Sequence, residues 1–200
     1  MSSAAKRIDV IGTIKDGVGI GIQNIGPIIV NFLLWIITIW IPYLNVGTTI
    51  GMMVGIVSKA SKGEMIPFTE IFDPKYRKYM GEYFLVNSLV MMGIVAALPF
   101  FFIPGIVIGI SWMFATIITV DKGKNPSEAI TLSNNATYGN KWRIFFVSFL
   151  LGLVAGLLGW IFSLPGGAVS IILVLILMLF MSFIVIGVQA SLYRQLTSDI

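Results

Sequence analysis

The sequence predicts an all-α membrane protein with six transmembrane helices arranged as three helical hairpins. Of its 200 residues, 57% are hydrophobic and only 11% are charged. A soluble domain has roughly 25% charged residues. A soluble chain of this length cannot bury so much apolar surface, so the bilayer is its expected solvent. The apolar residues also fall into six long runs, which are separated by short turns or by charged segments.

The six predicted spans cover residues 26–41, 43–57, 83–103, 105–120, 144–164 and 168–192. At a rise of 1.5 Å per residue, the longer runs cross a hydrocarbon core of ~30 Å. The first two and the fourth have about sixteen residues, or ~24 Å, so a shallow re-entrant hairpin is an alternative for the first pair. We therefore expect one integral membrane domain, 1–200, made of an N-terminal interfacial segment, 1–25, and hairpins over 26–58, 83–120 and 144–192.

The loops inside the three hairpins carry no charge and share a proline. Pro42, Pro104 and Pro165 follow one another at intervals of about 61 residues, and Gly105 follows the second of them. Proline ends a helix and glycine lets the chain turn back, so these residues predict tight turns. Triplication of one hairpin unit would explain the interval. The alternative is the even turn spacing of any six-span protein.

All 22 charged residues lie in four regions: the N-terminal segment, the second loop, the fourth loop and the C-terminal tail. With six spans, these four regions share one face of the membrane. The positive-inside rule assigns that face to the cytoplasm. We therefore expect a multi-pass protein of the inner membrane with both termini cytoplasmic. The net charge of +4 then reflects topology, and no nucleic-acid partner is expected.

The fourth loop contains a well-marked polar helix. Asn125 is a suitable N-cap, Pro126 suits the first helical position, and Glu128 complements the helix dipole at the third. Gly139 suits a left-handed C-terminal position. We interpret this segment as a cytoplasmic interfacial helix that acts as a structural elbow between two hairpins. Ligand binding is the alternative.

The second loop has a similar signal. Asp73 and Pro74 predict a helix start, and Tyr76, Tyr79 and Tyr83 follow at helical spacing among basic residues. Aromatic and basic residues at a membrane boundary indicate interface anchoring, with recognition of anionic lipid headgroups as the sharper alternative. The candidate lipid-interface residues are Lys75, Arg77, Lys78, Lys141, Trp142 and Arg143.

Glycines recur every four residues at three places, most clearly at Gly47, Gly51 and Gly55 in the second span. This spacing lets helix backbones approach closely. We expect intramolecular packing, with self-association as the alternative. The glycines within 16–24 do not match a nucleotide-binding spacing, so we expect a flexible interfacial segment there. The candidate packing residues are Gly47, Gly51, Gly55, Pro42, Pro104, Gly105, Pro165, Asn125, Pro126, Glu128 and Gly139.

The side chains available for chemistry are few. The chain has no cysteine and no histidine, which excludes disulfides, thiol chemistry and Cys/His metal sites. Glu64 and Glu70 suggest a divalent-ion site only weakly, because nearby bases favour charge pairing. Asn31 and Asn87 lie inside predicted spans, where amides bond across helices or line a polar path. We expect no catalytic residue, cofactor or metal.

Several residues also carry a resemblance to a known family. They are Ile103-Pro104-Gly105, Asp121, Pro126, Glu128-Ala129, Ser133, Gly139-Asn140 and Phe145. Over about residues 63–196, the chain resembles a family of uncharacterised prokaryotic polytopic membrane proteins. It is similar to the membrane domain fused to some glycerophosphodiester phosphodiesterases. The resemblance implies a membrane fold and does not extend to the phosphodiesterase, so it implies no enzymatic activity.

Together, these features predict a non-enzymatic accessory or scaffold protein of the inner membrane that interacts with lipids. The expected partners are membrane lipids, with a membrane protein or a second copy of the chain as further possibilities. A small transporter or an oligomeric pore is the alternative function, and a membrane-embedded lipid enzyme is a third. The sequence names no substrate.

Overall fold

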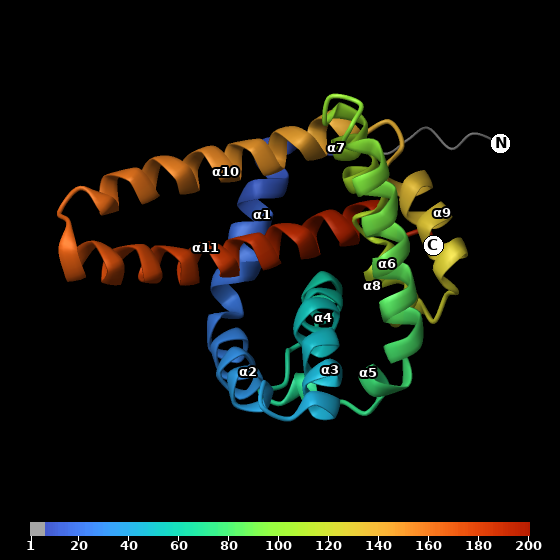
Figure 1. Ribbon diagram of the computed structural model, residues 1–200, viewed down its shortest axis with the longest axis horizontal. Helices are drawn as coiled ribbons and strands as arrows, with labels where there is room; N and C mark the ends of the chain where they lie inside the picture. Colours follow the sequence, from blue (N-terminus) through green and yellow to red (C-terminus); the bar gives the residue numbers. More distant parts are fainter. Residues whose placement is uncertain (1–6) are drawn as a thin grey trace.

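The computed structural model describes residues 7–200, which are all-helical and contain no strand (Figure 1). The predicted all-α class is therefore confirmed. In chain order, the elements are α1 (Val10–Gln23), α2 (Ile25–Thr38), α3 (Pro42–Ile50), the π-helix η1 (Gly51–Gly55), α4 (Ile56–Lys62), the 3-10 helix η2 (Glu70–Phe72), α5 (Lys75–Lys78), α6 (Met80–Ala97), α7 (Ile103–Trp112), α8 (Ala115–Lys122), α9 (Pro126–Thr137), α10 (Lys141–Ser163) and α11 (Gly167–Leu196).

Four helical stretches of the described chain are long and apolar enough to cross a membrane: α6, the α7–α8 run, α10 and α11. Helices α1 and α2 meet at a bend of 67° and would add a fifth crossing as one broken span. By length and composition, the structure thus has four or five candidate spans where the sequence predicts six. The shortfall lies in the first hairpin: α2 has only 14 residues, about 21 Å, and the second arm is divided into α3, the π-helix η1 and α4.

Residues Val10–Gln23 form a packed helix, α1, rather than the flexible segment expected over residues 16–24. Helix α1 begins at Val10, with the Asp9 carboxylate accepting from the Gly12 amide at 2.9 Å. It crosses α11 where glycines meet, and a Cβ on Gly187 would overlap the backbone oxygen of Gly17. This close approach is available only because neither residue has a side chain.

The predicted polar helix of the fourth loop is confirmed as α9. The Asn125 side chain accepts from the Glu128 amide at 2.9 Å, Pro126 is the first helical residue, and Gly139 has a φ of 77°. The cap and the turn therefore form as the residue types indicate. The membrane depth of α9 remains a prediction.

Helix α9 also completes the hydrogen bonds of a broken span. The chain breaks between α7 and α8, where the Ser133 hydroxyl accepts from the Phe114 amide at 3.1 Å and donates to the Ser111 carbonyl at 2.8 Å. Thr137, one turn further along, donates to the carbonyl of Ser133. Backbone groups freed in an apolar region need such partners. A polar helix in this hydrophobic chain therefore has a structural task.

The core lies where α1, α4, α8 and the end of α11 meet. Its fully buried side chains include Ile56, Phe114 and Ile118, and the Phe114 and Tyr193 rings stand edge to face at 5.6 Å. Figure 1 shows the α10–α11 hairpin extending well beyond this core. A Cβ at Gly152 or Gly156 on the extended part would meet no atom within 4 Å. The outer hairpin is therefore covered only by whatever surrounds the protein.

Candidate functional site

The carboxylate of Asp121, at the end of α8, joins three parts of the chain. It accepts from Ser58 at 2.5 Å, from the Lys62 ammonium at 2.5 Å and from the Tyr193 hydroxyl at 3.0 Å. Its side chain is only 7% exposed. Helices α4, α8 and α11 are thus held by one buried acid, whose charge is balanced by a lysine that reaches the surface.

A second buried acid, Glu70, lies in the segment between α4 and α6. It accepts from the Tyr76 hydroxyl, and the ammonium groups of Lys59 and Lys75 lie 3.6 and 3.5 Å away. Burial, together with the hydrogen bond to the charged Glu70, raises the pKa of Tyr76 well above its ordinary value. Tyr76 is therefore a neutral phenol that donates to the carboxylate.

Tyr76 does not anchor a membrane interface as its position in the sequence predicts. Its side chain is 1% exposed, because residues 63–79 fold inward against the first hairpin. The Asn31 amide holds this segment by donating to the Pro67 carbonyl at 2.8 Å and accepting from the Ile71 amide at 3.1 Å. Asn87, the other amide within a predicted span, accepts from Thr116 at 3.4 Å and so bonds across to α8, as expected.

The three glycines spaced by four residues, Gly47, Gly51 and Gly55, pack against this inward segment rather than against another long apolar helix. A Cβ on Gly47 would lie 2.6 Å from the Arg77 side chain, and one on Gly51 would lie 2.6 Å from the Ile71 backbone. A Cβ on Gly55 would overlap the hydroxyl of Tyr76. The predicted intramolecular packing is present, and its partner is the segment that contains η2 and α5.

The acidic side chains of the described residues do not form a metal site. Lys59 lies within 3.6 Å of both Glu64 and Glu70, and no group of three or more acidic ligands could hold a metal ion. A cavity of about 170 Å³ lies between the two acid networks, lined in part by Lys62 and Asp121. These two groups already pair with each other. Charge pairing, the favoured interpretation of Glu64 and Glu70, explains this region.

The six candidate lipid-interface residues form two groups. Helix α5 and the start of α10 lie at opposite ends of α6 in Figure 1. In the first group, Lys75 pairs with acids and Arg77 covers Gly47. In the second, Arg143 donates to the Ile8 carbonyl at 2.7 Å, while Trp142 is 74% exposed. Two members of the second group, Lys141 and Trp142, border a large apolar cavity.

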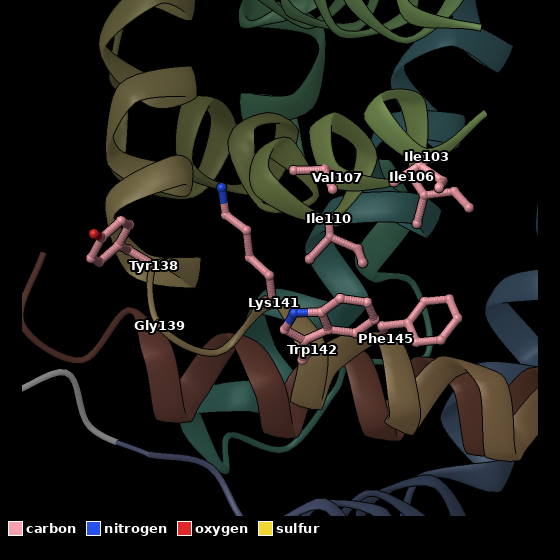
Figure 2. A pocket seen from close by; sticks show the side chains of 9 residues that line it. All are labelled: Ile103, Ile106, Val107, Ile110, Tyr138, Gly139, Lys141, Trp142 and Phe145. Carbon is pink, nitrogen blue, oxygen red and sulfur yellow. The ribbon is translucent and has the colours of Figure 1, made fainter. Parts of the chain in front are cut away.

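That cavity, here called the lateral pocket, has a volume of about 480 Å³ and lies between α7 and the start of α10 (Figure 2). Its residues are Ile103, Ile106, Val107, Ile110, Tyr138, Gly139, Lys141, Trp142 and Phe145. Figure 2 shows the Trp142 and Phe145 rings beside the isoleucines of α7, with the Lys141 amine far from Ile103. The pocket therefore has an apolar part along α7 and a lysine away from its Ile103 end.

The lateral pocket joins residues that the sequence assigns to opposite membrane surfaces. Ile103 belongs to a predicted outer turn, and Lys141 to a predicted cytoplasmic boundary, yet both line one cavity. The cause is the course of α10, which runs across the α6–α7 hairpin in Figure 1. The sequence predicted Lys141 and Trp142 as candidate lipid-interface residues. It gave no separate signal for the isoleucines of α7, which are part of a long apolar run.

No family model matches the chain, and no curated protein or solved structure is similar to it. The site is therefore interpreted from its own geometry.

Proposed function

We propose that the protein is a non-enzymatic accessory or scaffold protein of the inner membrane that binds lipid in its lateral pocket. The observation that supports this proposal is the pocket's composition: aliphatic side chains from α7, three aromatic side chains, and a single lysine. Ligand sites are commonly 300–1,000 Å³ and mostly apolar with few polar groups. An amphiphile that places one acyl chain and one polar group in the pocket matches this arrangement.

Filling the pocket tests the proposal. Val107→Trp places an indole in the cavity, and Val185→Trp on α11 adds the same group at a similarly exposed valine away from it. Native mass spectrometry of the detergent-extracted protein counts the lipids retained by each variant. We expect Val107→Trp to retain fewer lipids than both the wild type and Val185→Trp. Equal retention by all three would overturn the proposal.

The proposed orientation has the N-terminal segment and the C-terminal tail in the cytoplasm. It is supported by the clustering of charged residues outside the apolar runs. The middle of α1 also lies beside the end of α11, since Arg194 reaches Asp16 at 2.5 Å. Because the chain has no cysteine, Gly166→Cys and Lys124→Cys are single reporters. An impermeant thiol reagent should label only the first in intact cells; the reverse pattern would invert the orientation.

A small transporter or an oligomeric pore is the second candidate. The observation in its favour is the cavity of about 170 Å³ beside Tyr76 and Asp121, a polar space between helices. In membrane proteins, ionisable groups that face such a space mark ion or substrate paths. The native-mass experiment also separates the candidates, because an oligomeric pore requires a closed assembly of several copies.

A further inference from the structure

We propose that the lateral pocket selects a phospholipid with a net negative headgroup, whose phosphate binds the ammonium of Lys141 and whose acyl chain lies along α7. This inference rests on the proposed lipid-binding function and names the class of lipid. It is drawn from the charge of the pocket and from the direction in which its polarity changes.

Lys141 is the only charged residue among those that line the pocket in the described chain. Its ammonium contacts the Asn134 side-chain oxygen at 3.1 Å, a neutral group, and forms no ion pair within the described residues. An ammonium has three donors, so two remain for a phosphate.

The lysines that line the cavity of about 170 Å³ differ from Lys141 in their ion pairing. Lys62 and Lys75 both line it, and each pairs with a carboxylate of this chain. A phosphate there would have to displace an internal acid. At Lys141, by contrast, a phosphate would supply the missing negative charge.

The absence of a lining carboxylate distinguishes between lipid classes. A zwitterionic headgroup brings a cation as well as a phosphate, and no acid among the described lining residues would receive that cation. Lys141 is also the first residue of α10, a helix of 23 residues, so the partial positive charge of the helix N-terminus lies at the same end. Both charges favour a lipid with net negative charge.

The apolar part of the pocket fits an acyl chain that leads away from Lys141. On the side of α7, the pocket extends from Ile110 to Ile103. These residues lie seven positions apart in the sequence, which is about 10 Å along the helix. Trp142 lies next to Lys141, and tryptophan favours the level of the headgroups. The order of side chains therefore follows that of a lipid, from phosphate to hydrocarbon.

The test measures lipid preference with the full chain in vesicles that contain equal amounts of phosphatidylglycerol and phosphatidylcholine. The protein is extracted, and mass spectrometry gives the ratio of the two lipids that remain bound. We expect the wild type to retain more phosphatidylglycerol, and Lys141→Gln to lower the ratio about fivefold, the effect of one basic residue near an anionic surface. Lys141→Arg, which keeps the charge, should retain the wild-type preference.

Lys15→Gln is the matched control, because Lys15 is exposed on α1, is not a candidate lipid-interface residue and does not line the pocket. An equal loss of preference in this variant would assign the effect to general surface charge and overturn the inference. If Val107→Trp reduces total lipid while Lys141→Gln leaves the ratio unchanged, the lipid-binding function stands and the headgroup inference is wrong. If Val107→Trp leaves total lipid unchanged, both fail.

Discussion

The two ends of helix α11 are both rich in apolar residues but have different surroundings. On the outer part, Ile172 and Ile176 are 57% and 59% exposed, whereas Val188 and Leu192 on the inner part are 3% and 2% exposed. The inner part also carries small and polar residues that make specific contacts, such as Ser191, which donates to the Asp16 carboxylate at 2.5 Å. Hydropathy therefore identifies the helix, while small and polar residues identify the end that faces protein.

This difference follows from the solvent. Lipid chains are as apolar as leucine, so apolar side chains alone give little reason for two helices to associate in a membrane. Close backbone approach and interhelical hydrogen bonds supply that reason at the inner end. At the outer end of the hairpin, the Ser170 hydroxyl donates to the Ser163 carbonyl at 3.0 Å, and the exposed apolar surface around it fits a hydrocarbon environment. Four substitutions test this division.

The largest expected effect comes from Gly187→Ala at the crossing of α1 and α11. The added methyl would overlap the Gly17 backbone, so the helices must separate. We expect a loss of about 3 kcal/mol, the upper range for overpacking, measured as thermal unfolding in detergent. Gly156→Ala on the outer part of α10 meets open space and should be neutral or stabilising by up to about 1 kcal/mol. Equal melting of the two variants would contradict the comparison.

The next effect concerns Asp121, which links the inner end of α11 to α4 and α8. Asp121→Ala removes the charged acceptor of Ser58, Lys62 and Tyr193. We expect a loss of about 2 kcal/mol, in the range for hydrogen bonds to charged groups. The exposed Asp199→Ala in the tail is the control. A melting curve like that of wild type would show that the three segments hold together without the acid.

A smaller effect is expected at the cap of α9. Asn125→Ala removes the acceptor of the Glu128 amide and should lower stability by about 1 kcal/mol. Asn125→Asp keeps an acceptor and should restore it. If both variants melt alike, the cap does not support the helix that completes the α7–α8 break.

The smallest effect is expected for a surface ion pair. Lys124 and Glu128 lie 2.7 Å apart at positions i and i+4, and both side chains are substantially exposed. Lys124→Ala should change stability by no more than about 0.5 kcal/mol, because such pairs contribute little in water. A loss as large as that of Asn125→Ala would mean that surface charge, rather than buried contact, stabilises this part of the protein.

Local features were the most predictable from the sequence. The α9 helix forms between Asn125 and Gly139 because a cap, a first-turn proline and a left-handed glycine act over neighbouring residues. The long apolar runs likewise become α6, α7–α8, α10 and α11. The first hairpin was less predictable, because its runs are short and its second arm receives the segment over residues 63–79.

The candidate site was predicted only in part. Lys141 and Trp142 stand out because a basic and an aromatic residue precede an apolar run. Their position beside Ile103 and Ile106 depends on α10 crossing α7, which no periodicity reveals. The prediction for Tyr76 was wrong for the same reason. Its helical spacing is compatible with a membrane interface, and only the fold shows that its hydroxyl donates a hydrogen bond to Glu70.

The sequence by itself determined the helical class, the apolar runs that suit a membrane and the positions of the main turns, because these depend on composition and on neighbouring residues. Tertiary structure alone decided that Gly17 contacts Gly187, that the Ser133 hydroxyl accepts a hydrogen bond from the Phe114 amide at the α7–α8 break, and that α7 and α10 enclose a pocket. Each of these contacts joins residues from different helices. Their formation depends on the crossing of helices and on surface shape, which hydropathy and local spacing do not encode.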